Sequence, residues 1–419
     1  MLATPEIIRE TAQPSRVAEL LPKWRGIPLY RARLGDRRPD GADSPALPQL
    51  ANLPYVTKSD LRGGFPSNFL GDGRSLDTLL ADGDVELDYT SGTSEEQVPV
   101  LSQRGWWARQ EDAALRLNRF VARLLDENPS ARRATLTTPV CNGRVCDSPW
   151  RPAAHRVDGS TLYVNVARIP FLLTVADLDR MAGEVRDWAP LFLDVDPVHA
   201  VRFALHCEQK GITFPSLRFV LSSYEFTSVV HRRILERAFG VPVFNLYGST
   251  ETGHLLMEGE DGEMKPSLDT AFLEITDPDA NGVGDLVVTT LSNDHMPLLR
   301  YRIGDLVERR TAPYATTYFV QGRVRDSLRV TDGRRVTTWQ VDQCFAEASG
   351  IAHYQVRQNE DGSCLLRYIQ EGAGPAAHEL RNSVAALEQL LGCARRITSE
   401  SVDLLLPAPS GKFRLTLPV

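Results

Sequence analysis

Hydrophobic and polar residues alternate along this chain in blocks that predict strands and helices in turn. In 106–125 apolar residues recur at helical spacing, and in 228–240 they do so as far as Gly240, a residue type that ends helices. Short apolar runs at 216–223 and 241–247 predict buried strands on either side of the second helix. This alternation predicts a layered α/β body.

The pattern changes twice toward the C-terminus. From about 270 to 322 it predicts strands without helices, and the remaining residues predict a small α+β unit. The elements expected there are a hairpin turning at Asp332-Gly333, a helix at 339–349, a hairpin turning at Asp361-Gly362, a helix at 379–392 and a final strand at 401–406. We therefore expect an α/β fold with a large multi-layer N-terminal domain, 1–322, a hinge at 323–327 and a C-terminal α+β domain, 328–419.

Composition places the chain among soluble globular proteins. Its 419 residues are 42% hydrophobic and 24% charged, which suits two or three domains with a large core. A net charge of −7 argues against a nucleic-acid partner, and no apolar run approaches the roughly 18 residues that span a membrane. The first residues lack a signal-peptide pattern and the six cysteines are scattered, so we expect a cytoplasmic protein, monomeric or homodimeric.

Cys141 and Cys146 are the one close pair of cysteines, with His155 nearby. Two or three such ligands could hold a metal ion. A fourth ligand and paired spacing are missing, so we interpret them as small buried thiols around the Asn142-Gly143 turn.

The stretch YTSGTSEEQVPV, residues 89–100, begins as a phosphate-binding loop would. Its small residues supply hydroxyls, amides and a glycine that lets the backbone approach a ligand closely: Ser91, Gly92, Thr93 and Ser94. Glu95 and Glu96 then stand where such a loop would carry glycine and lysine. Two carboxylates pointing inward would repel pyrophosphate, whereas carboxylates pointing to solvent would not.

The stretch NLYGSTETGH, residues 245–254, combines three groups that suit a nucleotide. Tyr247 beside Gly248 can stack on a flat base, because the glycine leaves room. Thr250 can donate to a phosphate oxygen, and Glu251 can hold the Mg²⁺ that accompanies phosphates.

Three later stretches add charged residues. Asp305, after a glycine in RYRIGDLV, can accept hydrogen bonds from ribose hydroxyls. Arg323 lies at the expected domain junction in GRVRDSLRV, and Lys412 lies on a glycine-containing loop in PSGKFRL.

Together, and in this order, the five stretches resemble the motifs of the adenylate-forming superfamily, which comprises acyl-CoA synthetases, peptide-synthetase adenylation domains and luciferases. The resemblance covers about residues 86–419. IPLYRARL at 27–34 and LPYVTKSDLR at 53–62 look like segments of its phenylacetate-CoA ligase branch.

The resemblance implies a role for each nucleotide-binding residue. The loop 91–94 would wrap the β- and γ-phosphates of ATP, and Tyr247 would stack on adenine with Gly248 beside it. Thr250 would contact the α-phosphate and Glu251 the Mg²⁺. The remaining roles fall to Asp305 and Arg323 on the ribose, and to Ser223, Tyr224 and Glu225 in the adenine pocket.

The same resemblance implies a mobile C-terminal domain that carries Lys412 into the site. Displacing pyrophosphate by a carboxylate builds negative charge, which a lysine placed late by domain closure neutralises. Arg325 stands at the hinge position, where Asp or Lys is common. His254 is the one candidate zinc ligand after the Tyr-Gly stretch, so we expect no structural zinc.

The expected function is that of an AMP-forming carboxylate-CoA ligase. A carboxylic acid, aromatic or arylacetic by analogy with the branch, would react with ATP and Mg²⁺ to give acyl-AMP and pyrophosphate, and coenzyme A would then accept the acyl group. One alternative keeps adenylation but transfers the acyl group to the thiol of a separate carrier protein, an amine or another nucleophile. The other is a degenerate binding protein, which Glu95 and Glu96 suggest. The presence of Thr250, Glu251, Asp305, Arg323 and Lys412 argues against it.

Overall fold

The computed structural model describes residues 5–34, 53–71, 75–90, 97–137, 152–164, 167–312, 315–330, 333–392 and 396–419. These residues form two compact units. The first takes the described residues of 5–90, 97–122 and 246–320, and the second takes those of 123–245 and 321–419. No helix in these described ranges is long and apolar enough to cross a membrane.

The first unit combines short helices with a largely antiparallel sheet. Its N-terminal part contains α1 (Pro5–Trp24), α2 (Pro28–Leu34), α4 (Lys58–Arg62), α5 (Leu76–Asp82), the hairpin of β1 (Val85–Tyr89) and β2 (Pro99–Gln103), and α6 (Trp106–Leu115). Its later part contains β9 (Gly253–Glu258), β10 (Met264–Pro266), β11 (Ala271–Thr276), β12 (Val283–Thr290) and β13 (Tyr301–Ala312). Two further strands, β8 (Val243–Ser249) and β14 (Ala315–Arg323), run from one unit into the other along the chain.

The strand order in this unit is β11-β12-β13-β14-β10-β9-β8. One core of buried apolar side chains, from Val17 to Tyr318, fills the unit and includes Trp24, Tyr30 and Tyr301. The β-rich section predicted for 270–322 is therefore confirmed as β11 to β14.

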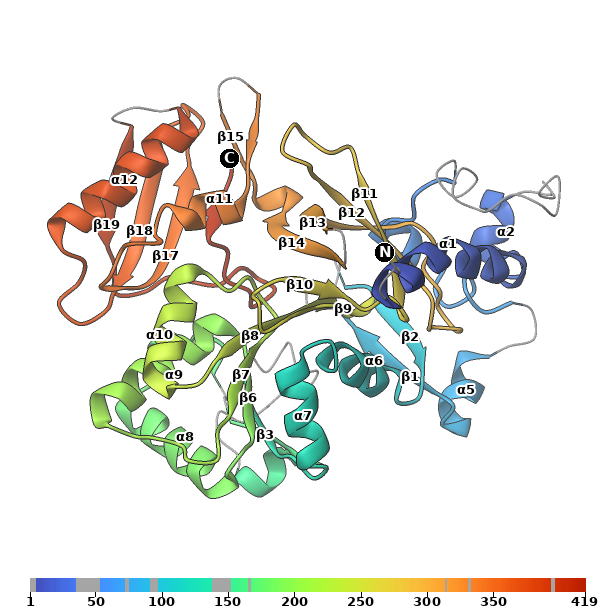
Figure 1. Cartoon of the computed structure of the whole chain (residues 1–419), viewed down its shortest axis with the longest axis horizontal. Helices are drawn as coiled ribbons and strands as arrows, with labels where there is room; N and C mark the ends of the chain where they lie inside the picture. Colours follow the sequence, from blue (N-terminus) through green and yellow to red (C-terminus); the bar gives the residue numbers. More distant parts are fainter. Residues whose placement is uncertain are drawn as a thin grey trace. The chain divides into compact units, whose positions relative to one another are not determined.

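The second unit begins with a parallel sheet in the order β8-β7-β6-β3-β5, with β4 antiparallel at its edge. Its elements are α7 (Arg119–Glu127), β3 (Arg133–Leu136), the 3₁₀ turn Ala153–Arg156, β4 (Val157–Asp158), β5 (Thr161–Tyr163), the 3₁₀ turn Pro170–Leu172, α8 (Val175–Trp188), β6 (Phe192–Val195), α9 (Pro197–Lys210), β7 (Phe219–Ser222) and α10 (Val229–Phe239). Helices α8, α9 and α10 lie side by side along the parallel strands (Figure 1). The α/β fold class is confirmed, and Gly240, at φ 67°, ends α10 as predicted.

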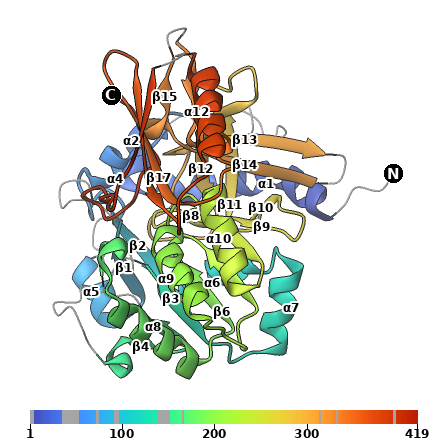
Figure 2. The same ribbon diagram turned by 90° about the vertical axis from the view of Figure 1, so that its left-hand side faces the viewer.

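The C-terminal segment belongs to the same unit. It contains the 3₁₀ turn Val324–Asp326, the hairpin of β15 (Leu328–Arg329) and β16 (Arg335–Val336), α11 (Thr338–Gln343), β17 (Ile351–Gln358), β18 (Cys364–Gln370), α12 (Ala377–Leu391), β19 (Ile397–Ser401) and β20 (Thr416–Leu417). The last four strands form a sheet in the order β19-β18-β17-β20, and α12 lies near it (Figure 2). The antiparallel strand pairing of both predicted hairpins is confirmed, although Asp332, in the first turn, lies outside the described residues. Helix α11 ends at Gln343, earlier than expected.

One core of buried side chains joins this segment to the parallel sheet, from Ala134 to Leu415. The two compact units divide the chain at positions other than 323–327. The movable C-terminal domain therefore stays a prediction.

Two predicted elements are wrong. The helix expected over 106–125 is two helices, α6 and α7, because the Asn118 side chain caps the second one by accepting the N–H of Val121 at 3.0 Å. The strand expected at 401–406 lies instead at 397–401, where β19 pairs in parallel with β18. The apolar run that suggested it leaves Leu406 61% exposed.

Candidate functional site

Tyr247 and Asp305, 58 residues apart in sequence, meet in the first unit. Tyr247 lies on β8 and Asp305 on β13, and the tyrosine hydroxyl donates to Oδ2 of Asp305 at 2.6 Å. Asp305 is buried. The bond fixes the orientation of the carboxylate relative to the tyrosine ring, so an aromatic face and an anionic acceptor form one preorganised pair.

Gly248 follows Tyr247 for a steric reason. The register of β8 and β9 shifts between Tyr247 and Gly248, where Gly248 pairs with His254 and Ser249 with Gly253. A Cβ at position 248 would stand 2.2 Å from the carbonyl oxygen of Gly253, so any side chain would force the two strands apart.

Glu251 is a buried carboxylate held by two partners in the same unit. The Tyr301 hydroxyl donates to its Oε1 at 2.9 Å, and Nζ of Lys58 lies 3.4 Å from the same oxygen. Burial raises the pKa of Glu251, but the charge of Lys58 and hydrogen bonds from Tyr301, Ser249 and its own backbone outweigh burial, so the net pKa is lowered. Glu251 is therefore an ionised oxygen donor, which fits a hard cation such as Mg²⁺. Thr250, beside it, is partly buried.

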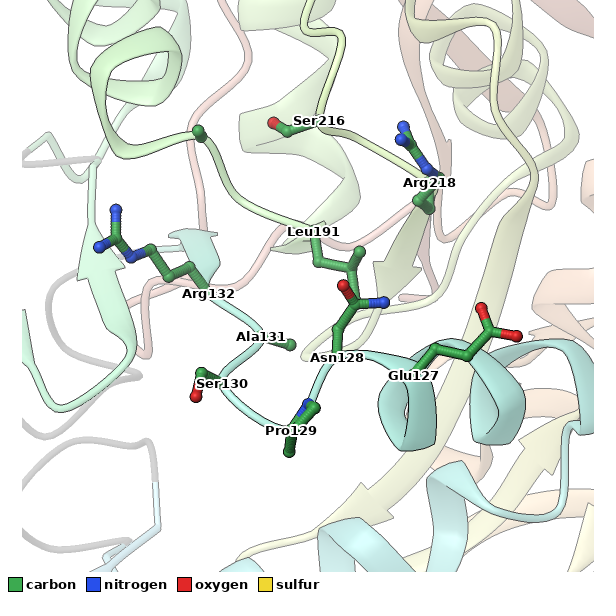
Figure 3. Close-up of a pocket in the computed structure, with 10 residues that line it drawn as sticks. Glu127, Asn128, Pro129, Ser130, Ala131, Arg132, Leu191, Ser216 and Arg218 are labelled. Atoms are coloured by element: carbon green, nitrogen blue, oxygen red, sulfur yellow. The ribbon is translucent and has the colours of Figure 1, made fainter.

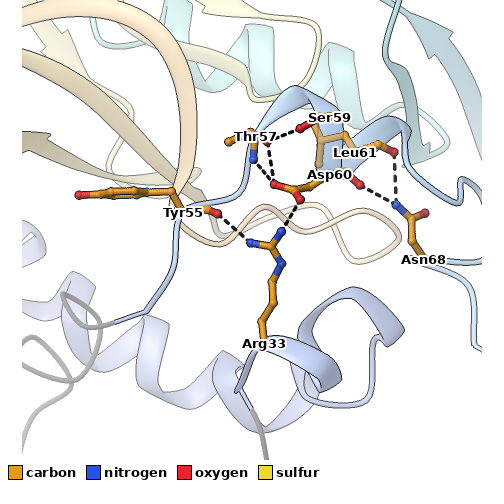
Figure 4. Close-up of polar contacts among 7 residues, drawn as sticks. All are labelled: Arg33, Tyr55, Thr57, Ser59, Asp60, Leu61 and Asn68. Atoms are coloured by element: carbon orange, nitrogen blue, oxygen red, sulfur yellow. Dashed lines mark hydrogen bonds and ion pairs between the residues drawn. The ribbon is translucent and has the colours of Figure 1, made fainter.

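The sequence motifs do not predict a role for Lys58. It lies at the start of α4, whose N-terminus is capped by Thr57 and Asp60 bonding to each other. Arg33 binds both Asp60 and the carbonyl of Tyr55, the latter at 2.8 Å (Figure 4). The segment resembling the ligase branch is therefore a locally braced structure.

The neighbouring strand contacts explain where Lys58 lies. Val56 donates to the carbonyl of Arg300 at 3.0 Å and forms a parallel bridge with Tyr301. The ring of Tyr55 lies under the guanidinium groups of Arg300 and Arg302, at 4.5 and 4.3 Å. Because Tyr301 is also the hydroxyl donor to Glu251, this bridge places Lys58 and Glu251 in the same neighbourhood.

A second cluster lies in the second unit, where β6 and β7 end. Tyr224, at φ 69°, follows β7 in the left-handed region, and its hydroxyl donates to Oδ2 of Asp194 at 2.9 Å. Ser223 donates to the other oxygen of Asp194 at 2.8 Å. Open α/β sheets bind ligands at the carboxyl ends of their parallel strands, which is where these residues lie.

Lys412 lies in this second cluster. Its Nζ donates to the carbonyl of Tyr224 at 2.9 Å, and the N–H of Phe413 donates to Oε1 of Glu225 at 2.8 Å. Asp196 lies close by, at the N-terminus of α9. Burial raises the pKa of Asp196 to about 7, although the backbone N–H groups of α9 and the charge of Lys412 lower it.

The pKa of Glu225 is also raised, well above its ordinary value. Burial is the main cause and the charge of Asp196 the second, while Lys412, the Phe413 N–H and Arg323 act against them. Sequence reasoning missed Asp194 and Asp196. The Asp196-Pro197 pair was the available signal, because Asp before Pro is a common helix start.

Arg323 and Arg325 lie on the segment predicted as a hinge. The side chain of Arg325 is 55% exposed and lies 3.8 Å from Asp326. Arg414 pairs with Asp326 at 2.7 Å and donates to the carbonyl of Arg325 at 3.2 Å, so the lysine loop and the hinge segment are bonded to each other.

The structure thus brings the predicted residues together in two groups, one in each unit. Tyr247, Gly248, Glu251 and Asp305 belong to the first unit, while Ser223, Tyr224, Glu225 and Lys412 belong to the second. The phosphate loop 91–96 and the pair Cys141 and Cys146 lie outside the described residues. Among those that are described, no group of three or more His, Cys, Asp or Glu side chains is placed to hold a metal ion.

A hollow of about 530 Å³ lies elsewhere in the second unit (Figure 3). Arg132, Leu191 and Arg218 line it, and each directly precedes a parallel strand. It therefore lies at the amino ends of the strands, and it contains none of the predicted site residues.

Comparison with known proteins gives distant relatives along nearly the whole chain. No protein-family model matches it. It is 24% identical over 361 residues to phenylacetate-coenzyme A ligase of Pseudomonas putida, covering 81% of this chain and 76% of the relative. It is 23% identical over 406 residues to phenylacetate-coenzyme A ligase of Escherichia coli strain K12, covering 91% of this chain and 87% of the relative.

Two solved structures show that the fold is shared. One is 2-hydroxyisobutyryl-CoA ligase in the postadenylation state with 2-HIB-AMP, at a TM-score of 0.70 and 16% identity, covering 96% of this chain and 87% of that one. The other is the anthranilate CoA ligase AuaEII with anthranoyl-AMP, at a TM-score of 0.54 and 16% identity, covering 80% and 66%.

Proposed function

Because the chain belongs to the adenylate-forming superfamily, we propose that it joins a carboxylic acid to AMP at the expense of ATP and then transfers the acyl group to a thiol. In the first step a carboxylate oxygen bonds to the α-phosphorus of ATP, and the bond to pyrophosphate breaks. In the second step the sulfur bonds to the acyl carbon, the bond to AMP breaks and the thiol loses its proton. The relatives named as phenylacetate-coenzyme A ligases favour an arylacetic or other aromatic acid, with coenzyme A as the acceptor.

The observation that carries this proposal is the position of Lys412. Its ammonium donates to the carbonyl of Tyr224 at the carboxyl end of β7, where ligands bind in open α/β sheets. A cation there can neutralise the charge that builds as the carboxylate attacks the phosphate. Arg325 would be the point on which the C-terminal domain turns between the two steps.

The first cluster would hold the nucleotide. Tyr247 and Gly248 would offer a flat face to adenine, Asp305 would accept from the ribose, and Thr250 would donate to the α-phosphate. The family resemblance adds Arg323 on the ribose and the loop 91–94 on the β- and γ-phosphates. Glu251 would hold Mg²⁺, which shields phosphate charge when bound. Lys58, next to Glu251, supplies a cation that the loop with Glu95 and Glu96 lacks.

The test is pyrophosphate release from a panel of carboxylic acids, with and without coenzyme A. Lys412→Ala should slow acyl-AMP formation by about 10²–10³, while a pre-made acyl-AMP should still react with coenzyme A at the wild-type rate. Lys210→Ala, an exposed lysine at the end of α9, is the matched control. If no acid gives pyrophosphate, the protein is a degenerate binding protein. If pyrophosphate appears but coenzyme A is not consumed, the acceptor is another nucleophile.

A further inference from the structure

We propose that Glu225 is a positioning residue that holds the Lys412 loop for acyl-AMP formation by accepting the N–H of Phe413. This inference rests on the proposed function, because it assigns Glu225 a role in the step that Lys412 serves. Glu225 follows β7, and its Oε1 accepts the N–H of Phe413 at 2.8 Å, across 188 residues of sequence.

The contact joins consecutive residues of the two segments. Two consecutive residues after β7 bind two consecutive residues of the loop: the Tyr224 carbonyl accepts from Lys412 at 2.9 Å, and the Glu225 side chain accepts from Phe413. The ammonium and the backbone next to it are therefore fixed at adjacent points. A shift of the Phe413 backbone would carry Lys412 with it.

Hydrogen bonds within the loop hold it together, so such a shift would move the loop as a unit. The N–H of Ala408 donates to the carbonyl of Lys412 at 2.8 Å, and the N–H of Gly411 donates to the carbonyl of Ala408 at 2.8 Å. Gly411, at φ 86°, closes this turn in a conformation that other residues rarely adopt. The segment from Ala408 to Lys412 is therefore a closed turn.

The ring of Phe413 anchors the loop separately from Glu225. It is buried among the rings of Phe171, His199 and His353, with centroid distances of 6.0, 6.2 and 5.5 Å and near-perpendicular planes. This aromatic pocket holds the side chain, whereas the bond to Glu225 holds the backbone N–H next to Lys412.

The position of the Glu225 carboxyl is costly, which argues that the contact is used. Its Oε2 is buried and has no hydrogen-bond partner among the described residues, and the carboxyl of Asp196 lies close enough to raise its pKa. A buried carboxyl with one unsatisfied oxygen destabilises a fold unless another contact offsets it.

The first test measures how strongly Glu225 protects the Phe413 amide. Hydrogen exchange of the Phe413 amide should be at least tenfold faster in Glu225→Ala, and also faster in Glu225→Asp, which keeps the carboxyl group but shortens its reach. Glu225→Gln retains an acceptor oxygen and should exchange as slowly as wild type. Glu236→Ala, on the exposed side of α10, is the matched control and should change nothing. Unchanged exchange in both Glu225→Ala and Glu225→Asp would overturn the proposal.

The second test measures the consequence. Glu225→Ala should slow acyl-AMP formation by about 10²-fold, because a shift of about 1 Å at a catalytic group costs that much, and it should leave the reaction of pre-made acyl-AMP within twofold. Glu225→Gln should restore the rate. The double variant Glu225→Ala/Lys412→Ala should be no slower than Lys412→Ala alone, since the carboxyl acts through the lysine. Multiplying losses would show that Glu225 acts independently. If no acid is activated even by wild type, the proposed function fails, while the exchange experiment still decides whether Glu225 holds the loop.

Discussion

Replacing Asp305 with alanine should weaken ATP binding by an amount that the structure allows us to bound. The carboxylate is buried and already oriented by a 2.6 Å bond from Tyr247, so it would meet a ribose without further ordering. A hydrogen bond to a charged group contributes about 1.5–3 kcal/mol. Asp305→Ala should therefore raise the Kd for ATP about 13- to 160-fold.

Tyr247→Phe removes the hydroxyl and keeps the ring, so it separates their contributions to ATP binding. The ring stays available for stacking and the carboxylate remains, and only the bond that orients Asp305 is lost. The Kd for ATP should therefore rise, but by less than in Asp305→Ala. The double variant should bind ATP no more weakly than Asp305→Ala alone, because the hydroxyl acts through the carboxylate. Calorimetric titration of all four proteins with ATP gives the coupling.

Two outcomes would refute this reasoning. Unchanged affinity in Asp305→Ala, with a lowered melting temperature, would mean that Asp305 only holds the strand after Gly304. Losses that multiply in the double variant would mean that the hydroxyl contacts the nucleotide itself. Asp294→Ala removes an exposed carboxylate of the same unit and should leave the Kd unchanged.

Three further predictions follow from other charged groups. Lys58→Gln removes the cation beside Glu251, so burial should raise the pKa of that carboxylate and shift the acidic limb of the pH–rate profile for pyrophosphate release to higher pH; an unmoved limb would contradict this. Burial raises the pKa of Asp342 from 3.8 to about 7, so the folded state holds its proton more tightly, and this group's contribution to stability, on the order of 4 kcal/mol, should be lost as pH rises from about 4 to about 7. Urea unfolding at pH 5 and pH 8 should show a smaller change in Asp342→Asn than in wild type, and equal changes would exclude Asp342 as the source. Replacing Glu95 and Glu96 by Gly and Lys should lower the KM for ATP, because repulsion near a polyanion becomes attraction, and lost activity would instead give the glutamates a positive role.

The hydrophobic pattern predicts the layered fold well and fails where a single contact decides the structure. Apolar spacing continues through Asn118, so it cannot show that this side chain caps α7 and also donates to the carbonyl of Glu258 at 2.9 Å. β19 is missed for a related reason: its residues are polar and mostly exposed, and backbone pairing with β18 alone makes them a strand. Both errors concern tertiary partners rather than local propensity.

The candidate site divides in the same way. Tyr247, Glu251, Asp305 and Lys412 lie in short motifs whose residue types already suggest their chemistry. Lys58 and Asp194 have no such signal, because each gains its place through a contact that spans many residues of sequence. The bridge of Val56 to Tyr301, for example, explains the position of Lys58. Motifs therefore predict the groups that we propose to bind a ligand better than the groups that position them.

The pocket that holds the Phe413 ring contains histidines that do not gain a proton in the pH range where histidine usually does. Burial lowers the pKa of His199 to about 3, and it lowers the pKa of His231, whose ring lies 3.0 Å from that of His353, to about the same value. Burial together with His231 lowers the pKa of His353 well below its ordinary value. These rings stay neutral from mildly acidic to alkaline pH, so the charge of the pocket that holds the lysine loop does not change over that range. The same rings must take up protons once the chain unfolds, so their contribution to stability falls as pH drops below about 6.5. The buried histidines therefore lower the stability of the protein in acid, while the charge of the pocket around Phe413 stays the same near neutral pH.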